Sequence, residues 1–458
     1  MVVQHNLRAM NSNRMLSITQ GTLNKSTEKL SSGYKVNRAA DDAAGLSISE
    51  KMRKQIRGLT QASLNAEDGI SAVQTAEGAL TEVHDMLQRM NELAVKAANG
   101  TNSTSDRQTI QDEVDQLLTE IDRVAETTKF NETYLLKGDE DKVAKYLNAH
   151  DAGIAGTLTQ GATNATFTMD QLKFGDTIKI AGREYHISGT AQQQKDIISG
   201  SVKVGQQVTI DGIMYTCSSV SNADKFELTQ ADLKAKINTT SQISVMVVNG
   251  KTYYGSGITN DKNVTTTTGA YALVQKELGL ASSIGADGST QATVAAAVKG
   301  SAATNTEGKM VFGIKKGSVQ IREAIDFSLH VGADADMTNK IAVKIDSLDT
   351  KGLGIQGLNV KDPNGAAATY AIDAIADAVA KISAQRSLLG AVQNRLDHTI
   401  NNLDNVVENT TAAESQIRDT DMATEMVKYS NNNVLAQAGQ SMLAQSNQAN
   451  QGVLSLLG

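Results

Sequence analysis

Apolar residues recur at intervals of three or four over a long N-terminal stretch, and this spacing limits what the chain can fold into. Twelve steps across 42 residues give a mean spacing of 3.5. The series is Met52, Ile56, Leu59, Ala62, Ala66, Ile70, Val73, Ala76, Leu80, Val83, Leu87, Met90 and Ala94. A period of 3.5 is that of a left-handed coiled-coil seam. The sequence therefore predicts one continuous helix, about 65 Å long, that packs against other helices.

Two further segments have the same spacing. One contains Ile110, Val114, Leu117, Ile121 and Val124, and Ser105 followed by Gln108 predicts a capping box at its start. The other covers residues 372–407 and follows DPNG (residues 362–365), a turn signal that holds the only proline. We expect the three rods to pack as a bundle, because each apolar face is too narrow to be stable alone.

The middle of the chain has a different pattern. From about residue 139 to residue 317, Gly, Thr, Ser and Asn replace the heptads. KFGDTIKIAGREYHI, starting at Lys173, aligns with KVGQQVTIDGIMYTC, starting at Lys203, at an offset of 30, and a looser third copy ends in VVNGKTYYG. Each copy alternates apolar and polar residues on both sides of a glycine turn, which predicts β-hairpins. A short β element is also predicted at Ile341, Val343 and Ile345.

Composition argues against several classes of protein. Aromatic residues make up 3% of the chain, tryptophan is absent, and the net charge is −7. The charge disfavours a nucleic-acid partner, which would need a basic patch. No run of 18 apolar residues predicts a transmembrane helix, and the first residues lack the apolar run of a secretory signal. Since Cys217 is the only cysteine, an intramolecular disulfide is excluded.

The search for catalytic chemistry yields one motif. GLGIQG (residues 352–357) fits the dinucleotide-binding pattern G-x-G-x-x-G, but the proline six residues later leaves no room for the helix that must hold the pyrophosphate. The six histidines are isolated and form no H-E-x-x-H motif, and Cys217 fits inert packing in a strand better than a reactive thiol. We therefore expect no catalytic, cofactor-binding or metal-binding residues, and no enzyme.

The two ends of the chain resemble a known family. LSSGYKVNRAADDAAGLSISEKMRKQIRGLTQASLNAEDGISAVQTAEGAL and LQRMNELAVKAANGTNSTSDRQTIQDEVDQLLTEIDRVAETTKFN resemble the N-terminal region of bacterial flagellins. LGAVQNRLDHTINNL, IRDTDMATEMV and VLAQAGQSMLAQSNQANQGVLSLL resemble the flagellin C-terminus. The resemblance covers roughly residues 1–138 and 318–458.

The resemblance implies a mainly α protein: a long coiled-coil-like helical bundle built from the N- and C-terminal segments, with an inserted β-rich variable domain. Residues 1–41 and 417–458 would be the inner-tube terminal helices. Residues 42–138 and 318–416 would form the helical-rod core domain with a short β element, and residues 139–317 the inserted domain with its hairpin repeats.

The resemblance also implies function, location and partners. The chain would be secreted through the flagellar export channel and would polymerise with copies of itself into the extracellular flagellar filament used for motility. An export chaperone, a filament cap protein and the hook–filament junction protein would be its bacterial partners. No nucleic acid and no membrane would be involved.

The terminal helices are the expected polymerisation interface. Val434, Ala438, Met442, Ala449, Val453 and Leu456 form an apolar stripe, and the N-terminal strip contains Val2, Ala9, Leu16, Leu23 and Leu30 at seven-residue intervals. We expect the C-terminal helix to become stable when it packs against this strip and against neighbouring copies. Ordering about 40 residues costs more free energy than burial of this stripe returns, so we expect the C-terminal segment to be largely disordered in the free subunit. The predicted interface residues are Leu16, Leu23, Leu30, Val434, Met442, Val453 and Leu456.

Other roles stand beside that of a filament subunit. A hook–filament junction protein shares the terminal helices, but AEDGISAVQTAEGAL and ATEMV favour the filament subunit. A zinc protease in the insert is disfavoured by the missing H-E-x-x-H, whereas carbohydrate or host binding by the insert stays open. Flagellins are also ligands of a flagellin-sensing Toll-like receptor, and the resemblance of LQRMNELAV carries Arg89, Leu93 and, on the second rod, Glu113 onto this chain as receptor contacts. The bland interpretation of these residues is two solvated charges and a packing leucine.

Overall fold

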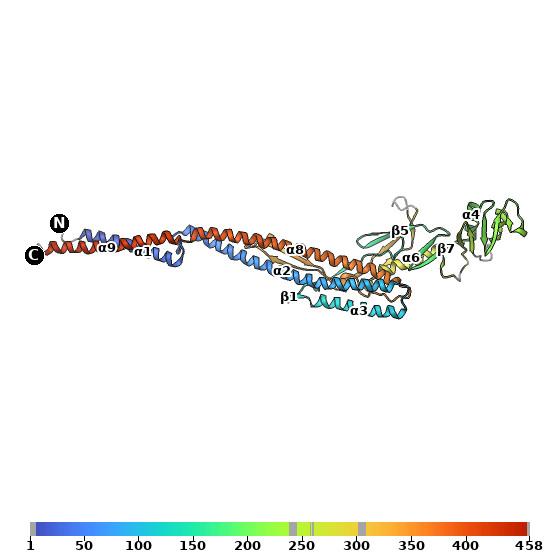
Figure 1. Ribbon diagram of the computed structural model, residues 1–458, viewed down its shortest axis with the longest axis horizontal. Coiled ribbons are helices and arrows are strands. Elements are labelled where there is room, and N and C mark those ends of the chain that lie inside the picture. Colours follow the sequence, from blue (N-terminus) through green and yellow to red (C-terminus); the bar gives the residue numbers. More distant parts are fainter. Residues whose placement is uncertain (1–5, 238–244, 257, 259–260, 301–307, 456–458) are drawn as a thin grey trace. The chain divides into compact units, whose positions relative to one another are not determined.

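The computed structural model describes residues 6–237, 245–256, 258, 261–300 and 308–455, the last six of these by backbone alone. The chain divides into two compact units. Unit 1 comprises Met1–Ser71, Ser328–Ala342 and Val392–Gly458, and unit 2 comprises Ala72–Phe327 and Val343–Ala391. Two long helices, α2 (Ala43–Ala98) and α8 (Ala366–Arg418), contribute residues to both units (Figure 1).

The terminal helices of unit 1 run side by side in opposite directions (Figure 1). Helix α1 covers Leu7–Ser32 and helix α9 covers Met422–Ser455. Asn6, which caps the start of α1, donates from Nδ2 to the carbonyl of Ser446 near the end of α9 at 3.3 Å. The start of α1 therefore lies beside the last turns of α9 in one antiparallel pair.

The side chains that α1 and α9 shield from solvent alternate at steps of three and four, as in a coiled coil. Most of them are small or polar, which lets two helices approach closely because side-chain size sets the interaxial distance. The shielded series is Ala9, Ser12, Leu16, Thr19, Leu23, Ser26 and Leu30 on α1, and Glu425, Tyr429, Asn432, Ala436, Gly439, Leu443 and Ser446 on α9.

One hydrogen bond inside this seam involves a charge. Ser26 Oγ donates to Glu425 Oε1 at 2.6 Å, and both side chains are buried. The second carboxylate oxygen of Glu425 lies 3.3 Å from Lys428 Nζ. The hydrogen bond from Ser26, followed by the interactions with Lys428 and Lys29, lowers the pKa of the Glu425 carboxyl although burial opposes the shift. The seam is therefore built for the ionised form of Glu425.

In this structure residues 422–455 form one helix that pairs with α1, which is the packing that the sequence predicts against the N-terminal strip. Disorder of this segment in the free subunit stays a prediction. The stripe proposed to need cover, which includes Val434 and Met442, faces away from α1 and is exposed.

The rest of unit 1 is a small core where α2 and α8 meet a hairpin. Strands β18 (Ile325–His330) and β19 (Lys340–Ile345) form a two-stranded sheet, and the connection between them contains the 3-10 turn η3 (Met337–Asn339). Ala66, Val331, Ile341 and Leu396 are buried together there. The predicted β element is confirmed, since Ile341, Val343 and Ile345 are buried and alternate with exposed residues.

In unit 2, α2 packs against α3 (Thr104–Thr127) and the first half of α8. The predicted seam is buried along this part of α2, at Val73, Ala76, Leu80, Val83, Leu87, Met90 and Ala94. The capping box of α3 is two residues earlier than predicted. Ser103, not Ser105, is the N-cap, and Asp106 makes the reciprocal bond, because both pairs have the required spacing and Ser103 is the one that precedes the first helical turn.

Buried polar side chains of α3 hold the segment that leads into α8. Arg107, only 3% exposed, donates from Nη1 to the Pro363 carbonyl at 2.9 Å. Gln111 donates to the Leu358 carbonyl and accepts from the Val360 N–H. This segment begins with the short helix α7 (Thr350–Leu353). Its carbonyl and amide groups are thus satisfied without a sheet.

The insert between the helices is built from short strands and helices. Strand β3 pairs with β17 where the insert leaves and rejoins the helical segments, next to the predicted boundaries at 139 and 317. The bounds are β1 (Lys129–Phe130), β2 (Thr133–Tyr134), β3 (Lys142–Tyr146), β4 (Thr157–Gln160), β5 (Asn164–Asp170), β6 (Thr177–Ile180), β7 (Arg183–Ser188), α4 (Ala191–Ser201), β8 (Gln207–Ile210), β9 (Ile213–Cys217), η1 (Ala223–Lys225), β10 (Glu227–Leu228), α5 (Gln230–Lys236), β11 (Val245–Val248), β12 (Lys251–Tyr254), β13 (Val264–Thr266), α6 (Thr267–Ala281), β14 (Thr293–Val294), β15 (Val298–Lys299), β16 (Lys309–Lys315) and β17 (Ser318–Arg322).

The three sequence repeats fold as hairpins: β6–β7, β8–β9 and β11–β12. In each turn both central residues have positive φ, at Ala181–Gly182, Asp211–Gly212 and Asn249–Gly250. This is the backbone of a type I′ turn, which matches the twist of the two strands. The glycine at the second position makes each turn possible at low cost.

The three hairpins do not follow one another as tandem repeats, because the segment with the second and third hairpins is inserted between two paired strands, β7 and β13. Strand β13 pairs in parallel with β7, although α4 to β12 intervene in sequence. The chain segments that enter and leave this insertion lie side by side: Gly189 N–H donates to the Tyr254 carbonyl, and Ser256 N–H donates to the Gly189 carbonyl. Residues 190–254 have their own core around Ile198, Val208, Leu233 and Met246, separate from the core that contains Phe167 and Phe312. We call residues 190–254 the nested module.

The Ser26–Glu425 bond predicts acid-sensitive pairing of α1 with α9. A carboxyl whose pKa is lower in the folded chain stabilises the fold above its unfolded pKa, and this stability is lost as pH falls through the folded value. Amide protection in α9, corrected for intrinsic exchange, should therefore decline below about pH 4.5. Glu425→Gln keeps an acceptor for Ser26 but does not titrate, so it should reduce this decline.

Asp421 precedes α9, and hydrogen bonds from Thr424 also lower the pKa of its carboxyl. The comparison is therefore made in an Asp421→Asn background. An acid decline of equal size with and without Glu425→Gln would contradict the assignment to this carboxylate.

The paired connections predict that the nested module can be removed. We expect a variant in which a short Gly-Ser linker replaces the nested module, residues 190–254, to keep the helical circular dichroism and thermal melting of unit 1 and of the helices of unit 2. The reason is that the buried cluster around Ile198 is lost as a whole, while Phe167 and Phe312 keep their neighbours. Loss of cooperative melting in the shortened chain would show that the module supports the remaining core.

Candidate functional site: the outward face of the terminal helices

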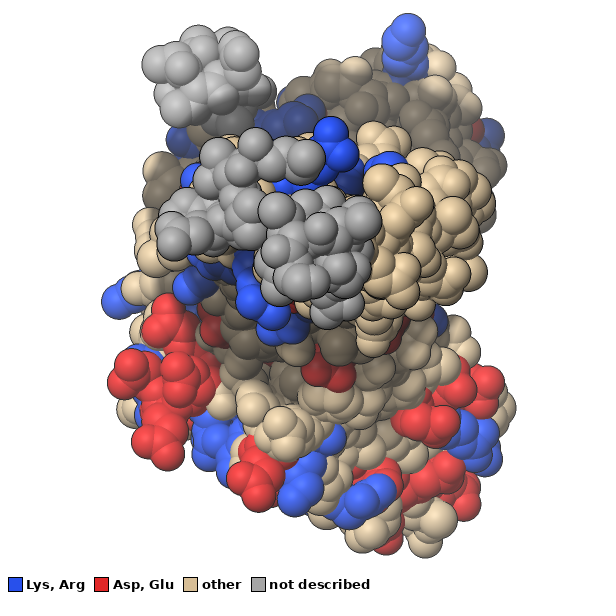
Figure 2. All heavy atoms as spheres, turned by 90° about the vertical axis from the view of Figure 1, so that its left-hand side faces the viewer, with Lys and Arg blue, Asp and Glu red and all other residues tan. Residues whose placement is uncertain are grey.

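The outward face of the α1–α9 pair carries large apolar side chains. Those of more than half exposure are Leu7, Met10, Met15 and Ile18 on α1 and Met426, Val427, Val434, Leu435 and Met442 on α9. Figure 2 looks at the end of the molecule that bears the termini: uncharged side chains lie to the right of the grey residues, and Lys and Arg side chains lie below and behind them. We call this set the outward apolar face. So many large apolar groups on one helix pair are unusual for a surface exposed to water.

Charge is nearly absent from the same stretch. Between Tyr429 and Ser455, α9 contains no Asp, Glu, Lys or Arg, and its polar residues are mainly Asn, Gln and Ser. Between Ala9 and Asn24, Arg14 is the one charged residue of α1. A protein partner could therefore cover this face without the desolvation of many charges, which is the costly part of burying a polar surface.

The structure separates the predicted interface residues into two groups. Leu16, Leu23 and Leu30 are half-buried in the seam against α9 of the same chain, and a Cβ on Gly439 would lie 3.2 Å from Leu16 Cδ1. Helix α9 of the same chain covers part of each of these three leucines, and their contact with other copies stays a prediction. Their role is to hold the pair together.

The predicted residues on α9 lie elsewhere. Val434 and Met442 are exposed, at 65% and 57%. The backbone of Val453 is helical, its side chain is outside the described residues, and so is Leu456. Sequence reasoning missed Leu7, Met10, Met15, Ile18 and Leu435. The sequence does contain a signal for them: α1 has a second set of apolar positions outside the strip of leucines that recurs every seven residues. When one set pairs with α9, the other set stays exposed.

The residues proposed for receptor contact lie on α2 and α3 of unit 2. Arg89 Nη2 and Nε lie 2.9 and 3.0 Å from Glu113 Oε1, and Nη1 lies 3.0 Å from Glu92 Oε2. Hydrogen bonds to Glu92 and then Glu113 raise the pKa of the Arg89 guanidinium. Arg89 and Glu113 are about half exposed, so a partner can reach this bridge between the two helices.

Leu93 is placed differently, and the prediction of a direct contact by this side chain is wrong. Leu93 is 2% exposed because it points into the helical core of unit 2. One turn away, Arg89 points to solvent. Leu93 can therefore position Arg89 through packing, but a partner cannot touch it without opening the helices.

The described residues show no group of three or more His, Cys, Asp or Glu side chains placed to hold a metal ion. Cys217 is buried in the nested module. In the GLGIQG segment, Gly352 lies in α7 and Gly354 and Gly357 have positive φ, while the next helix begins only at Ala366. Gly354 and Gly357 thus serve turns that follow a short helix. Among the described residues, no helix is apolar and long enough to cross a membrane.

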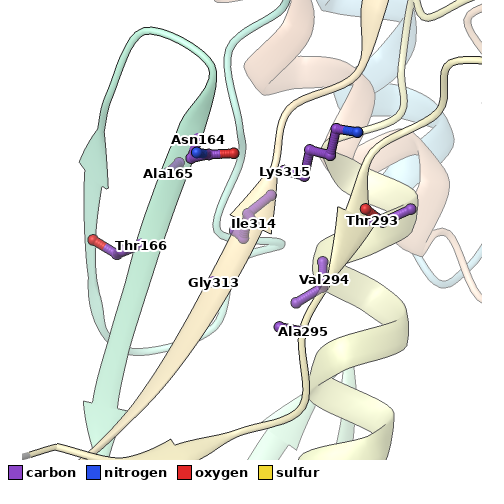
Figure 3. A pocket seen from close by; sticks show the side chains of 9 residues that line it. All are labelled: Asn164, Ala165, Thr166, Thr293, Val294, Ala295, Gly313, Ile314 and Lys315. Carbon is purple, nitrogen blue, oxygen red and sulfur yellow. The ribbon is translucent and has the colours of Figure 1, made fainter.

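A hollow of about 460 Å³ lies on the sheet of the insert (Figure 3). Strands β5, β14 and β16 line it, and Gly313 and Ala295 are among its small residues. Lys315 is the one charged residue in the lining. Because no acid and base face each other there, the hollow lacks the pair that a hydrolytic site needs.

Comparison with known families covers both helical ends of the chain. The family model described as bacterial flagellin N-terminal helical region matches residues 3–141. The model described as bacterial flagellin C-terminal helical region matches residues 372–457. The solved structure of FliC from Burkholderia pseudomallei covers 71% of this chain and 99% of its own, with 20% identity and a TM-score of 0.25.

Curated relatives match over essentially their whole length. A flagellin of Clostridium tyrobutyricum is 37% identical over 460 residues, which cover 98% of this chain and all of the relative. A flagellin of Bacillus subtilis is 35% identical and covers all of both chains. A flagellin of Salmonella typhimurium is 34% identical, covering 98% of this chain and 99% of its own. With both helical ends matched and full-length relatives above 30% identity, the chain belongs to the bacterial flagellin family.

Proposed function

We propose that this chain is the structural subunit of a bacterial flagellar filament, exported from the cell and polymerised outside it to support motility. The flagellin family is one of structural proteins and not of enzymes. The observation that carries the proposal is the outward apolar face: α1 and α9 are already paired, yet Met10, Ile18, Val434 and Met442 stay exposed. Such a surface gains free energy when copies of the chain cover it.

Polymerisation by this face needs no new fold. The seam keeps α1 and α9 together while the larger side chains remain free, so each copy would present a preformed helix pair. Preformed surfaces lose less conformational entropy on association than disordered segments do. The uncharged stretch from Tyr429 to Ser455 further allows several copies to approach on different sides.

The same face would need protection before assembly. We propose that an export chaperone binds it inside the cell, and that a cap protein and the hook–filament junction protein receive it outside. A paired helix with an exposed apolar register suits the helix-in-groove mode of recognition. Hook-associated proteins that resemble this chain over most of their length are consistent with shared terminal helices at the junction.

A second proposal concerns recognition by the host. The bridge from Arg89 to Glu113 is exposed on unit 2 and presents a planar guanidinium with neighbouring carboxylates. Arginine is over-represented among residues that dominate binding energy. We propose that a flagellin-sensing Toll-like receptor contacts Arg89 and Glu113, with Leu93 acting only by packing beneath them.

The assembly proposal predicts opposite behaviour for the same charge on the two faces of α9. Met442→Asp should leave the melting of the monomer unchanged and abolish seeded polymerisation, because its carboxylate is solvated until a second copy covers it. Ala436→Asp should lower the monomer's melting temperature, because Ala436 is 6% exposed in the seam and a buried unpaired carboxylate costs several kcal/mol.

Seeded growth is followed by light scattering and electron microscopy, and monomer melting by circular dichroism. Normal filaments from Met442→Asp protein would refute the outward apolar face as the polymerisation surface. Equal effects of the two substitutions on monomer melting would instead refute the assignment of the two faces.

The receptor proposal predicts a selective loss. Arg89→Ala should weaken signalling in cells that carry the receptor by about tenfold or more, the effect of losing an arginine hot spot. Arg123→Ala is the matched control: Arg123 is an exposed arginine on α3 that bonds to Glu120 within one helix. Both variants should keep the monomer's melting temperature, since exposed ion pairs add little stability. Equal signalling by both variants would exclude Arg89 as a contact.

A further inference from the structure

Three asparagines in the chain are followed directly by glycine: Asn99, Asn249 and Asn364. This pairing has a specific chemistry. The backbone nitrogen of the following residue can attack the side-chain carboxamide carbon of asparagine, and glycine leaves that nitrogen unhindered because it lacks a side chain. The local fold decides whether the two atoms can meet.

At Asn99 the fold brings the reacting groups together. Asn99 lies in the exposed connection between α2 and α3, and its Oδ1 accepts a hydrogen bond from the Thr101 N–H at 3.3 Å. This Asx-type contact folds the carboxamide over the peptide that joins Asn99 to Gly100. Within the described residues, the Gly100 N–H has no hydrogen-bond acceptor, so its nitrogen is available.

At Asn249 the fold points the carboxamide elsewhere. Asn249 and Gly250 form the type I′ turn of the β11–β12 hairpin, with φ of 50° and 77°. Asn249 Nδ2 lies 3.5 Å from the Ser201 carbonyl, which draws the side chain toward α4. The cross-strand pairs on both sides of the turn hold this geometry.

At Asn364, both the side-chain carboxamide and the backbone nitrogen that would attack it are engaged in hydrogen bonds. Its Oδ1 accepts a hydrogen bond from Arg183 Nη2 at 3.0 Å. The nitrogen that would attack is also engaged, since Gly365 N–H donates to the Asp362 carbonyl at 3.1 Å. The chain thus contains one free Asn-Gly pair and two that its own contacts restrain.

We propose that Asn99 is a site of spontaneous deamidation in the folded protein, and that the product is mainly isoaspartate. The Gly100 nitrogen bonds to Asn99 Cγ and loses its proton to solvent, while the Cγ–Nδ2 bond breaks and ammonia leaves. Water then opens the resulting cyclic imide. Attack at Cγ restores an aspartyl chain, whereas attack at the former main-chain carbonyl carbon of Asn99 routes the chain through Cγ and frees an α-carboxylate.

Arg107 selects between these two openings. Its guanidinium, buried at 3% exposure, donates to the Asn99 carbonyl from Nη2 at 3.1 Å and to the Ala97 carbonyl from Nε at 2.9 Å. A donor on the Asn99 carbonyl stabilises the oxyanion that forms when water attacks that carbon. The freed α-carboxylate then keeps a charge-assisted hydrogen bond to Arg107. Arg107, which also donates to the Pro363 carbonyl, therefore favours isoaspartate as the product at Asn99.

The test uses the full-length protein, aged in neutral buffer and digested with trypsin at intervals. The three pairs fall in separate peptides, residues 97–107, 237–251 and 362–381. Mass spectrometry measures the exchange of the amide for a carboxyl in each peptide, and an isoaspartate methyltransferase measures the isoaspartyl fraction. We expect Asn99 to convert several-fold faster than Asn249 and Asn364 in buffer, and the three rates to converge in urea.

Gly100→Ala is the matched variant for the attacking residue. Gly100 does not have a left-handed φ, and a Cβ there would meet no atom within 4 Å, so the fold should accept alanine. Conversion at Asn99 should slow several-fold while the other two sites are unchanged. Equal native rates at all three sites, or no effect of Gly100→Ala, would overturn the proposal for Asn99.

The role of Arg107 has its own readout. The isoaspartyl fraction at Asn99 should be higher in the folded protein than in urea, and Arg107→Lys should lower it if the variant keeps its melting transition. If Arg107→Lys does not fold, the comparison between buffer and urea in the unmodified sequence decides alone. An isoaspartyl fraction that is the same in both solvents would refute the selection by Arg107.

Discussion

The seam between α1 and α9 is the contact on which the proposed function depends. Small and polar side chains, such as Ala436, Gly439 and Ser26, make up most of it and let the two helices approach, while the apolar residues of the outward apolar face stay outside the seam. A seam of leucines on both sides would bury more area within one chain, and it would leave less for other copies. The α1–α9 pair can therefore form within one chain and still leave apolar side chains exposed for association with other copies. The buried Glu425 carboxylate adds a requirement for one register, because only Ser26 and its neighbours can satisfy it.

In the helical part of unit 2, polar side chains of α3 hold the segment that leads from α7 to α8. Arg107, Gln111 and Asp122 of α3 bind main-chain groups between Thr350 and Pro363. These bonds satisfy main-chain groups of the stretch from α7 to α8, most of which lies outside helices and strands. The connection between α2 and α3 is therefore positioned by the same arginine that positions the start of α8. A covalent change at Asn99 would act on both.

Local patterns in the sequence predicted the helices and hairpins well, because those patterns are themselves local. The 3.5 spacing placed Val73 to Ala94 in the core, and the glycine turns placed all three hairpins. Pairings between distant residues could not be predicted in this way: β13 joins β7 across the whole nested module. The site shows the same limit. Leu93 is buried because α3 and α8 complete the core around α2, and the α1 leucines are covered because α9 selects their register.

The two adjacent connections at Gly189 and Gly255 have a consequence for how such genes change. When the two ends of an inserted segment lie side by side, the segment does not have to bridge a distance between the strands that flank it. Its length and sequence can then vary, provided that it buries its own apolar residues. Recombination at this point would exchange the nested module in one event, while the reading frame of the helical ends and the contacts within them remain intact. Antibodies raised against residues 190–254 would then fail to bind a descendant whose helical ends are unchanged.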